Sequence, residues 1–335
     1  MSTSSRLRAR LALMGLTLAM IATPALAQSD LGGQRAGTSS GSFLRIGIGA
    51  RATGLGESFV AVANDPSAIY WNPAGLASLL RKEVAVSHVE WPADIGYEHI
   101  TLVLPTQKFG GSFGFQFGLL STRLDETTEL QPFGTGRSFV YSDMVAGAAY
   151  ARRWTDKLLV GFGLKYVRED LGADVGGPTT SAVLFDVGSI YYLGLGSVRI
   201  ATSLSNFGSE FKPSGEYVSP HSGELRIYDG YDPPMVFRYG VAFEPIENAH
   251  HRVTAALEIN QPADNQQLLK AGGEWVWDRR FMLRSGYNFT AEDLAFSAGA
   301  GFALDFAGTR GQLDYAYTDG GFLGAIHRMS LGVRF

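Results

Sequence analysis

From Val84 to Phe335 the sequence repeats one pattern, in which short segments of alternating apolar and polar residues are separated by turn residues. Alternation with a period of two places the two kinds of side chain on opposite faces of a β-strand. The segments run to about ten residues, the length that a tilted transmembrane strand needs, whereas strands of soluble proteins average about five or six. We predict fourteen strands, at Val84–Trp91, Tyr97–Leu104, Gly111–Leu120, Ser138–Arg152, Lys157–Arg168, Ser181–Leu193, Val198–Asn206, Met235–Glu244, Arg252–Asn260, Leu268–Trp277, Phe281–Phe289, Leu294–Leu304, Gln312–Thr318 and Ile326–Phe335.

The predicted fold is all-β: a transmembrane antiparallel β-barrel of about 14 strands, with a short plug segment of helical turns inside the lumen. A soluble β-sandwich would also alternate, but with its apolar face inward. In a transmembrane barrel the apolar face meets lipid, and the sheet closes because an open edge would leave backbone groups unpaired in the bilayer. Aromatic residues near the strand ends favour the barrel, because they match its interfacial girdles: Trp91, Tyr97, Tyr150, Trp154, Tyr191, Tyr192, Trp275, Trp277, Phe289, Tyr317 and Phe335.

The last predicted strand ends on a phenylalanine, and every second residue before it is apolar back to Met329. This ending resembles the C-terminal signal of bacterial outer-membrane barrels, which their assembly machinery recognises. We therefore expect the bacterial outer membrane as the location, with its lipid and the barrel assembly machinery as partners. The predicted assembly signal consists of Tyr317, Met329, Leu331, Val333 and Phe335.

The opposite faces of the strands carry charged residues that the barrel would turn toward its lumen. One interpretation is that these charges hold the plug or pair across the barrel. The other is a charged conduit whose walls touch a substrate, and both stay open because a charge deep in the wall needs either a partner or water. The predicted lumen charges are Arg238, Arg252, Glu258, Lys270, Glu274, Arg284, Asp305, Asp314 and Arg328, with Arg199 and Arg334 in the same pattern.

Connection lengths alternate along the predicted strands. The connections after odd-numbered strands include the long ones, such as Ser121–Arg137 and Phe207–Pro234, and those after even-numbered strands are short. Outer-membrane barrels have long extracellular loops and short periplasmic turns, so both termini are expected in the periplasm. The longest loop carries Tyr217, Tyr228 and Tyr231, and we consider a lid, a docking surface or an ordinary exposed loop.

The first 27 residues have the organisation of a secretory signal peptide. Arginines at 6, 8 and 10 precede the apolar run Leu11–Ile21, and Ala25-Leu26-Ala27 fits a cleavage site. The alternative, a membrane anchor helix, needs a run of about 20 apolar residues. We expect a signal peptide at 1–27, an N-terminal extension and plug at 28–83, and the barrel at 84–335.

The stretch Gly47–Ala77 is too rich in Gly, Ala, Asn and Pro for a transmembrane strand. It contains two helix-start signals, in which Asn64 or Asp65 caps a turn at Pro66 and Asn72 caps a turn at Pro73. Such a segment suits the inside of the barrel, with an aromatic pair as its packing core. The plug motif consists of Arg51, Gly54, Gly56, Asn64, Asp65, Pro66, Tyr70, Trp71, Asn72, Pro73 and Gly75.

Several function classes find no support in the residues. The chain has no Cys, six scattered His and a net charge of −4 without a basic stripe, so we expect no metal site and no nucleic-acid partner. The run Gly47-Ile-Gly49-Ala-Arg-Ala52 lacks the βαβ context of a dinucleotide fingerprint, and no nucleophile elbow is present. We expect no cofactor and no enzymatic activity.

The run from Gly54 to Leu76, which ends in Trp71-Asn72-Pro73-Ala74-Gly75-Leu76, resembles the N-terminal motif of the PorV/PorQ family. The wider group is the FadL-like outer-membrane proteins, in which a similar run ends in Asn-Pro-Ala. The resemblance implies a fourteen-stranded barrel plugged from the periplasmic side.

The resemblance implies two functions. The first is an accessory of type IX secretion that handles exported cargo with a C-terminal sorting domain. The alternative is a passive FadL-like transporter of small hydrophobic molecules, such as fatty acids or hydrocarbons, which leave the barrel sideways through a gap in its wall. The glycines Gly110, Gly111, Gly114 and Gly118 of the third strand are candidates for that gap.

Overall fold

The computed structural model describes residues 36–128, 130–219, 222–291 and 293–335. The predicted signal peptide lies outside these residues. Among the described residues, fourteen strands form one closed antiparallel barrel, in which β1 pairs with β16 to close the wall. The barrel strands are β1 (Glu83–Trp91), β2 (Ile95–Thr106), β3 (Gly111–Asp125), β4 (Ser138–Arg153), β5 (Leu158–Asp170), β6 (Thr179–Tyr192), β7 (Arg199–Gly208), β10 (Val236–Glu247), β11 (His251–Pro262), β12 (Leu268–Trp277), β13 (Phe281–Asn288), β14 (Phe296–Phe306), β15 (Thr309–Asp319) and β16 (Ala325–Arg334).

The predicted strands all correspond to barrel strands, and the fold class is confirmed. The main difference in length is β3, which continues five residues beyond the predicted end at Leu120. Residues 121–125 are polar or charged apart from Leu124, so alternation did not mark them, yet they pair in register with the start of β4. Pairing between neighbours therefore continues past the apolar part of the wall.

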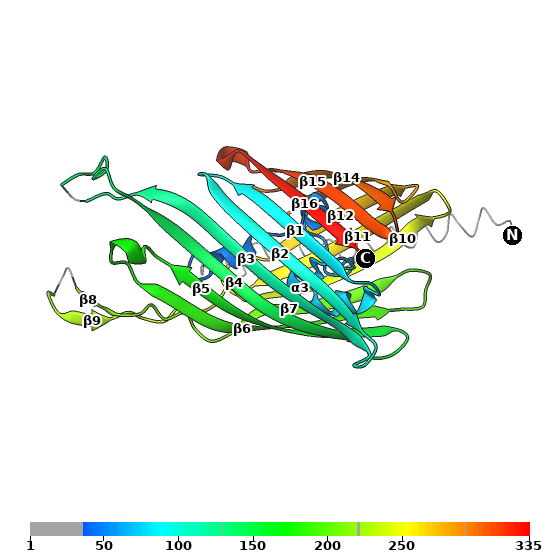
Figure 1. Ribbon diagram of the computed structural model, residues 1–335, viewed down its shortest axis with the longest axis horizontal. Helices are drawn as coiled ribbons and strands as arrows, with labels where there is room; N and C mark the ends of the chain where they lie inside the picture. Colours follow the sequence, from blue (N-terminus) through cyan, green and yellow to red (C-terminus); the bar gives the residue numbers. More distant parts are fainter. Residues whose placement is uncertain (1–35, 129, 220–221, 292) are drawn as a thin grey trace.

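The connection between β7 and β10 holds a small hairpin that the sequence did not predict. It consists of β8 (Glu216–Val218) and β9 (Leu225–Ile227), which pair only with each other and extend away from the barrel (Figure 1). Three residues per strand are too few for a recognisable alternation, which explains why the whole connection was predicted as a loop.

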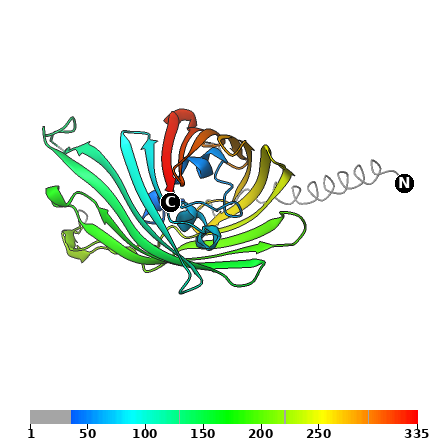
Figure 2. The ribbon, with the colours of Figure 1, turned by 45° about the vertical axis from the view of Figure 1, so that its right-hand side comes forward.

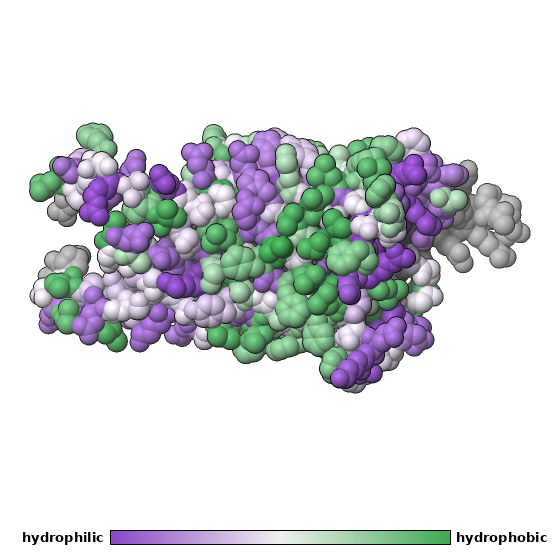
Figure 3. Space-filling view, viewed as in Figure 1, coloured by the Kyte–Doolittle hydropathy of each residue, from purple (hydrophilic) through white to green (hydrophobic). Residues whose placement is uncertain are grey.

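Side chains alternate across the wall with the apolar face outward. In β13, Phe281, Leu283 and Tyr287 are exposed on the outside, while Arg284 and Asn288 are buried inside. Hydrophobic residues cover much of the barrel face seen in Figure 3. The inverse arrangement expected of a transmembrane barrel is therefore present.

The two ends of the barrel differ. At one end, here the long-loop end, residues 126–137, 171–178 and 209–235 connect neighbouring strands. At the other end, the short-turn end, residues 154–157, 278–280 and 307–308 make tight connections, and the C-terminus lies there (Figure 1).

The N-terminal segment lies inside the barrel (Figure 2). It has short helical turns at η2 (Ser42–Arg45), α2 (Ala50–Gly54), α3 (Ala68–Trp71) and η3 (Pro73–Ser78). Two further turns, η4 (Ala173–Val175) and η5 (Gly321–Leu323), lie in connections at the long-loop end. In the described residues, no helix has the length and apolar character to cross a membrane.

Candidate functional site

The N-terminal segment from Ser39 to Leu79, here the plug, follows the inner wall strand by strand. Ala50 N donates to Ser330 Oγ on β16 (2.8 Å), and Val60 N donates to Glu258 on β11 (2.7 Å). Further on, the Asn72 side chain donates to the Ser189 carbonyl on β6 (3.2 Å), and Leu79 O accepts from Ser112 on β3 (3.2 Å). From Ala50 to Leu79 the plug thus passes from the last strands of the barrel to the first ones, against the order of the chain.

Glycines of the wall make this close approach possible. A Cβ added at Gly286 or Gly272 would overlap the plug backbone at Leu55, and one at Gly161 would overlap Pro73. The high glycine content therefore has a local cause, since the plug backbone lies where wall side chains would otherwise stand. Other wall glycines in contact with the plug are Gly114, Gly188, Gly240 and Gly299.

The plug reaches both ends of the barrel. Near its start, Ser40 Oγ and Gly41 N donate to Glu169 (2.6 and 2.8 Å), and Arg45 pairs with Asp264 (3.0 Å) at the long-loop end. Its last residues lead into β1 at the short-turn end. The resemblance implied a plug inserted from the periplasmic side, and the described segment extends through the whole lumen instead of closing only that mouth.

The two expected helix starts differ in the structure. Asn72 lies at the N-cap of η3, and its side chain accepts from Ala74 N (3.1 Å) with Pro73 in the first position. At the other start, Asp65 Oδ1 accepts from Ser67 N (2.9 Å), and α3 begins only at Ala68, two residues after Pro66. Asn64 does not cap this turn, because its side chain accepts from Arg51 (2.6 Å).

The aromatic pair of the plug is buried and hydrogen-bonded. Tyr70 donates to the Leu44 carbonyl and Trp71 to the Ile48 carbonyl, both at 3.0 Å. Their rings pack edge to face at 4.8 Å, and the Arg238 guanidinium lies 5.7 and 5.6 Å from the two ring centroids. The pair thus joins the two halves of the plug, and an inward cation of β10 covers it.

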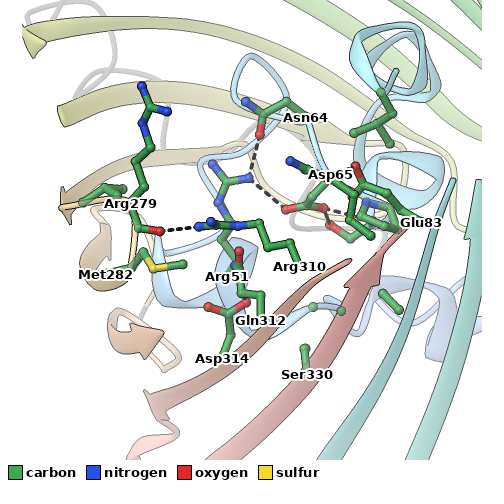
Figure 4. Close-up of a pocket in the computed structure, with 18 of the residues that line it drawn as sticks. Arg51, Asn64, Asp65, Glu83, Arg279, Met282, Arg310, Gln312, Asp314 and Ser330 are labelled. Atoms are coloured by element: carbon green, nitrogen blue, oxygen red, sulfur yellow. Dashed lines mark hydrogen bonds and ion pairs between the residues drawn. The ribbon is translucent and has the colours of Figure 1, made fainter. Parts of the chain in front are cut away.

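Arg51 joins the plug to the wall at the centre of a buried ionic network (Figure 4). Its guanidinium donates to both oxygens of Glu274 (2.9 and 3.0 Å) and pairs with Asp65 (3.0 Å). Glu274 also accepts from Arg284 (2.7 Å), which pairs with Asp314 (2.7 Å). Each buried charge here has an opposite partner, as a lumen charge requires.

Other predicted lumen charges also hold the plug. Glu258 accepts from two backbone N–H groups, those of Phe59 and Val60. Lys270 pairs with Glu57 of the plug (2.7 Å), and although burial alone would raise the pKa of Glu57, Lys270 and Arg328 keep it below its usual value. These contacts favour anchoring of the plug over direct contact with a substrate.

Two predicted lumen charges lie at the mouth instead of deep in the barrel. Asp305 is 63% exposed in its side chain and pairs with Arg310 (3.0 Å), and Arg252 is also exposed. Both line a cavity of about 1080 Å³ at the short-turn end, which Figure 4 shows between the plug and the strand ends. Arginines of the turns, Arg279 and Arg280, border it as well.

Two buried charges on β5 and β6 escaped the sequence analysis. Lys165 on β5 pairs with Asp186 on β6 (2.9 Å), and Asp186 accepts from Asn206 N (2.8 Å). Arg199, which the sequence analysis placed in the lumen pattern, donates its Nε–H to the Ala61 carbonyl of the plug (2.6 Å). The inward positions of β4 to β6 mix charges with Gly, Ala and Val, which obscures a polar face in the sequence.

The predicted assembly signal lies at the seam of the barrel. Met329, Leu331 and Phe335 are exposed, and their strand pairs with β1 on one side and β15 on the other. Tyr317 on β15 lies opposite His327 of β16, and Val333 is half-buried. Recognition of these residues by an assembly machinery stays a prediction.

The described pairing of β3 with β2 and β4 has no register break at the candidate glycines. Gly114 faces Leu76 and Ile69 of the plug, and Gly118 faces Tyr97 and other inward side chains. Their small size serves packing inside the lumen. The register breaks that occur lie between β6 and β7 and between β10 and β11.

Replacing Asn72 by alanine removes a cap, a link within the plug and a link to β6. We expect a loss of roughly 2 kcal/mol in the free energy of unfolding, because a helix cap is lost and buried carbonyls lose their donor. We also expect raised uptake of bulky antibiotics with unchanged heat-modifiable mobility on gels, since the barrel itself is intact. Unchanged conductance and uptake in this variant would contradict the role of the plug as a seal.

The closed fourteen-stranded barrel, with short helical turns in its N-terminal segment, matches the fold of solved hydrocarbon transporters. Among solved structures, the toluene transporter TbuX of Ralstonia pickettii matches with a TM-score of 0.56 and 12% identity, over 86% of this chain and 97% of that one. The toluene transporter TodX of Pseudomonas putida matches with a TM-score of 0.54 and 14% identity, over 86% and 97% of the two chains. The monoaromatic hydrocarbon channel CymD matches with a TM-score of 0.54, 12% identity and the same coverages.

Comparisons of sequence give less information than the comparisons of structure. The family described as Uncharacterised protein family (UPF0164) matches residues 18–154, which include the whole plug and the first strands. No curated protein matches the chain. At these identities the solved structures establish the fold alone.

Proposed function

We propose that this protein is a passive conduit for small hydrophobic molecules across the bacterial outer membrane, with the plug as its gate. The observation that carries the proposal is an apolar contact between the plug and the wall in the long-loop half of the barrel, here the apolar lining, which lies beside the inward acids Asp143 and Glu169. Phe43 and Leu44 of the plug are buried in one cluster with Tyr97, Val145 and Phe211. Barrels that pass water-soluble solutes have polar lumens, whereas an apolar solute is stabilised by such a lining.

The short-turn half of the lumen has the opposite character. The ionic network around Arg51 closes it, and the polar cavity of about 1080 Å³ lies beyond the network. An apolar molecule entering from the long-loop side would meet charges there, so release requires a shift of the plug or an exit through the wall. We place an exit through the wall between β6 and β7, where the pairing is interrupted. Asp186 and Asn206 disturb the register there.

Similarity to hydrocarbon channels supports the choice of ligand class. TbuX and TodX are described as toluene transporters, and the barrels share most of their length with this chain. Toluene and alkylated benzenes are therefore the first compounds to test, followed by fatty acids.

The test is uptake by cells that produce the protein in their outer membrane. We expect faster uptake of radiolabelled toluene than in cells without it, while uptake of glycerol, a small polar solute, stays the same. Equal toluene uptake with and without the protein would exclude the conduit.

A second candidate is the secretion accessory that the PorV/PorQ resemblance implies. The exposed hairpin favours it, because Val218, Leu225 and Ile227 are each more than 60% exposed beyond the barrel. Such a surface suits a protein partner. Purification from outer membranes distinguishes the two candidates, since co-purified exported cargo supports secretion and bound hydrocarbon or lipid supports the conduit.

A further inference from the structure

Three inward side chains form a row across neighbouring strands near the long-loop end. Asp143 on β4 lies directly opposite Glu169 on β5, and Glu169 lies directly opposite Thr180 on β6. Their exposures are 3%, 4% and 4%. Directly opposed residues have Cβ atoms about 4.5–5.5 Å apart, so the three oxygen-bearing groups are immediate neighbours inside the barrel.

This row lacks the charge compensation found elsewhere in the lumen. Within the described residues, no Lys, Arg or His forms an ion pair with Asp143 or Glu169, whereas Glu274, Asp314 and Asp186 each have one. Like charges directly opposite each other on a sheet are destabilising. Two adjacent buried carboxylates therefore need a proton or a cation between them.

Unsatisfied oxygen atoms mark where a cation fits. Among the described residues, Asp143 Oδ1 and Thr180 Oγ1 are buried and have no hydrogen-bond partner. The remaining contacts are neutral: Tyr141 donates to Asp143 Oδ2 (3.0 Å), and Ser40 Oγ and Gly41 N donate to Glu169. The donors present orient the two carboxylates without neutralising them.

We propose that Asp143, Glu169 and Thr180 form a binding site for a hard divalent cation, Ca²⁺. The site offers oxygen only, the ligand type that Ca²⁺ takes, and it lacks the nitrogen or sulfur that Zn²⁺ prefers. Water completes the six to eight ligands that Ca²⁺ needs. With two carboxylates the affinity belongs to the class of extracellular sites, with a Kd of about 10⁻⁴ to 10⁻³ M.

Occupancy of the site acts on the plug, because Glu169 also holds Ser40 and Gly41. A cation at this position fixes the start of the plug to β4, β5 and β6 at the long-loop end. The site thus makes the order of the plug depend on the Ca²⁺ concentration outside the cell. This inference is independent of what the barrel transports.

Binding is measured on the full-length protein, refolded in detergent, with Tb³⁺ as a luminescent probe. Tyr141 is hydrogen-bonded to Asp143, so excitation of tyrosine is expected to sensitise Tb³⁺ emission, and added Ca²⁺ should displace it. Asp143→Asn is expected to lose the emission. The matched control is Asp174→Asn, an exposed acid of η4 at the same end, which should keep it. Equal emission from Asp143→Asn and the original protein would overturn the site.

Thermal unfolding gives a second measurement, in which the original protein and Asp143→Asn respond differently to Ca²⁺. Without Ca²⁺, Asp143→Asn should unfold at a higher temperature than the original protein, because the repulsion with Glu169 is removed. With millimolar Ca²⁺, the original protein should gain stability and the variant should not. If the carboxylates share a proton instead, Ca²⁺ leaves both unfolding temperatures unchanged, and the proposal fails.

Discussion

Replacing Gly286 by valine is expected to displace the plug and leave the barrel closed. The added side chain would occupy the place of the backbone between Leu55 and Gly56, and backbone atoms cannot turn away as a flexible side chain does. Overpacking of this kind costs about 3 kcal/mol. We expect a conductance in planar bilayers well above that of the original protein, and greater sensitivity to large antibiotics.

The matched control is Gly332→Val on β16. This glycine is also in the wall, but a Cβ there meets nothing within 4 Å. It should change neither conductance nor antibiotic sensitivity. If both variants behaved alike, contact between wall glycines and the plug would not be what closes the barrel.

Arg51→Ala is expected to have the second large effect. The substitution removes the partner of Asp65 and one of the three guanidinium groups that pair with Glu274, which is almost fully buried. Removing one partner of a buried ion pair costs about 3–5 kcal/mol, because the other charge stays uncompensated. We expect the free energy of unfolding, measured in urea, to fall by about 3 kcal/mol, the lower end of this range, because Arg284 still faces Glu274. We also expect raised conductance.

Arg310→Ala distinguishes this effect from the loss of any arginine at the same end. Arg310 pairs with Asp305, whose side chain is largely exposed, and exposed pairs contribute only about 0.2–1 kcal/mol. Adding the second substitution Glu274→Gln to Arg51→Ala should recover part of the lost stability, because the double variant no longer has the uncompensated charge. No recovery would mean that the network does not hold the plug through charge.

The fold could be predicted from the sequence because lipid outside and polar groups inside force a strict alternation. The strands from β10 to β16 show this best, since aromatic residues such as Phe281 and Tyr287 alternate there with charged or amide residues. The hairpin of β8 and β9 could not be predicted, because it extends away from the barrel and its strands have three residues each. Alternation arises where one face of a strand has an apolar surrounding and the other a polar one. The hairpin lacks this arrangement.

The site was predictable in part. Capping chemistry is local, so Asn72 and Pro73 could be placed from the sequence alone. The partners of Arg51 could not, because the carboxylate of Glu274 lies 223 positions away and reaches it only when the barrel closes. Asp143 and Glu169 were missed for a related reason, since their opposition depends on the register between β4 and β5.

The path of the plug has a consequence for the way the chain reaches its final state. The plug contacts β5 and the β11–β12 connection at its start, β16 at Ala50 and β3 at Leu79, so its partners include both the last strand to be made and some of the first. A sheet that is still open offers only part of this surface, so the plug has no complete binding surface before β1 pairs with β16. Long-range contacts of this kind form slowly. Closure of the barrel and seating of the plug therefore form one cooperative step, and a newly made barrel is open until that step is complete.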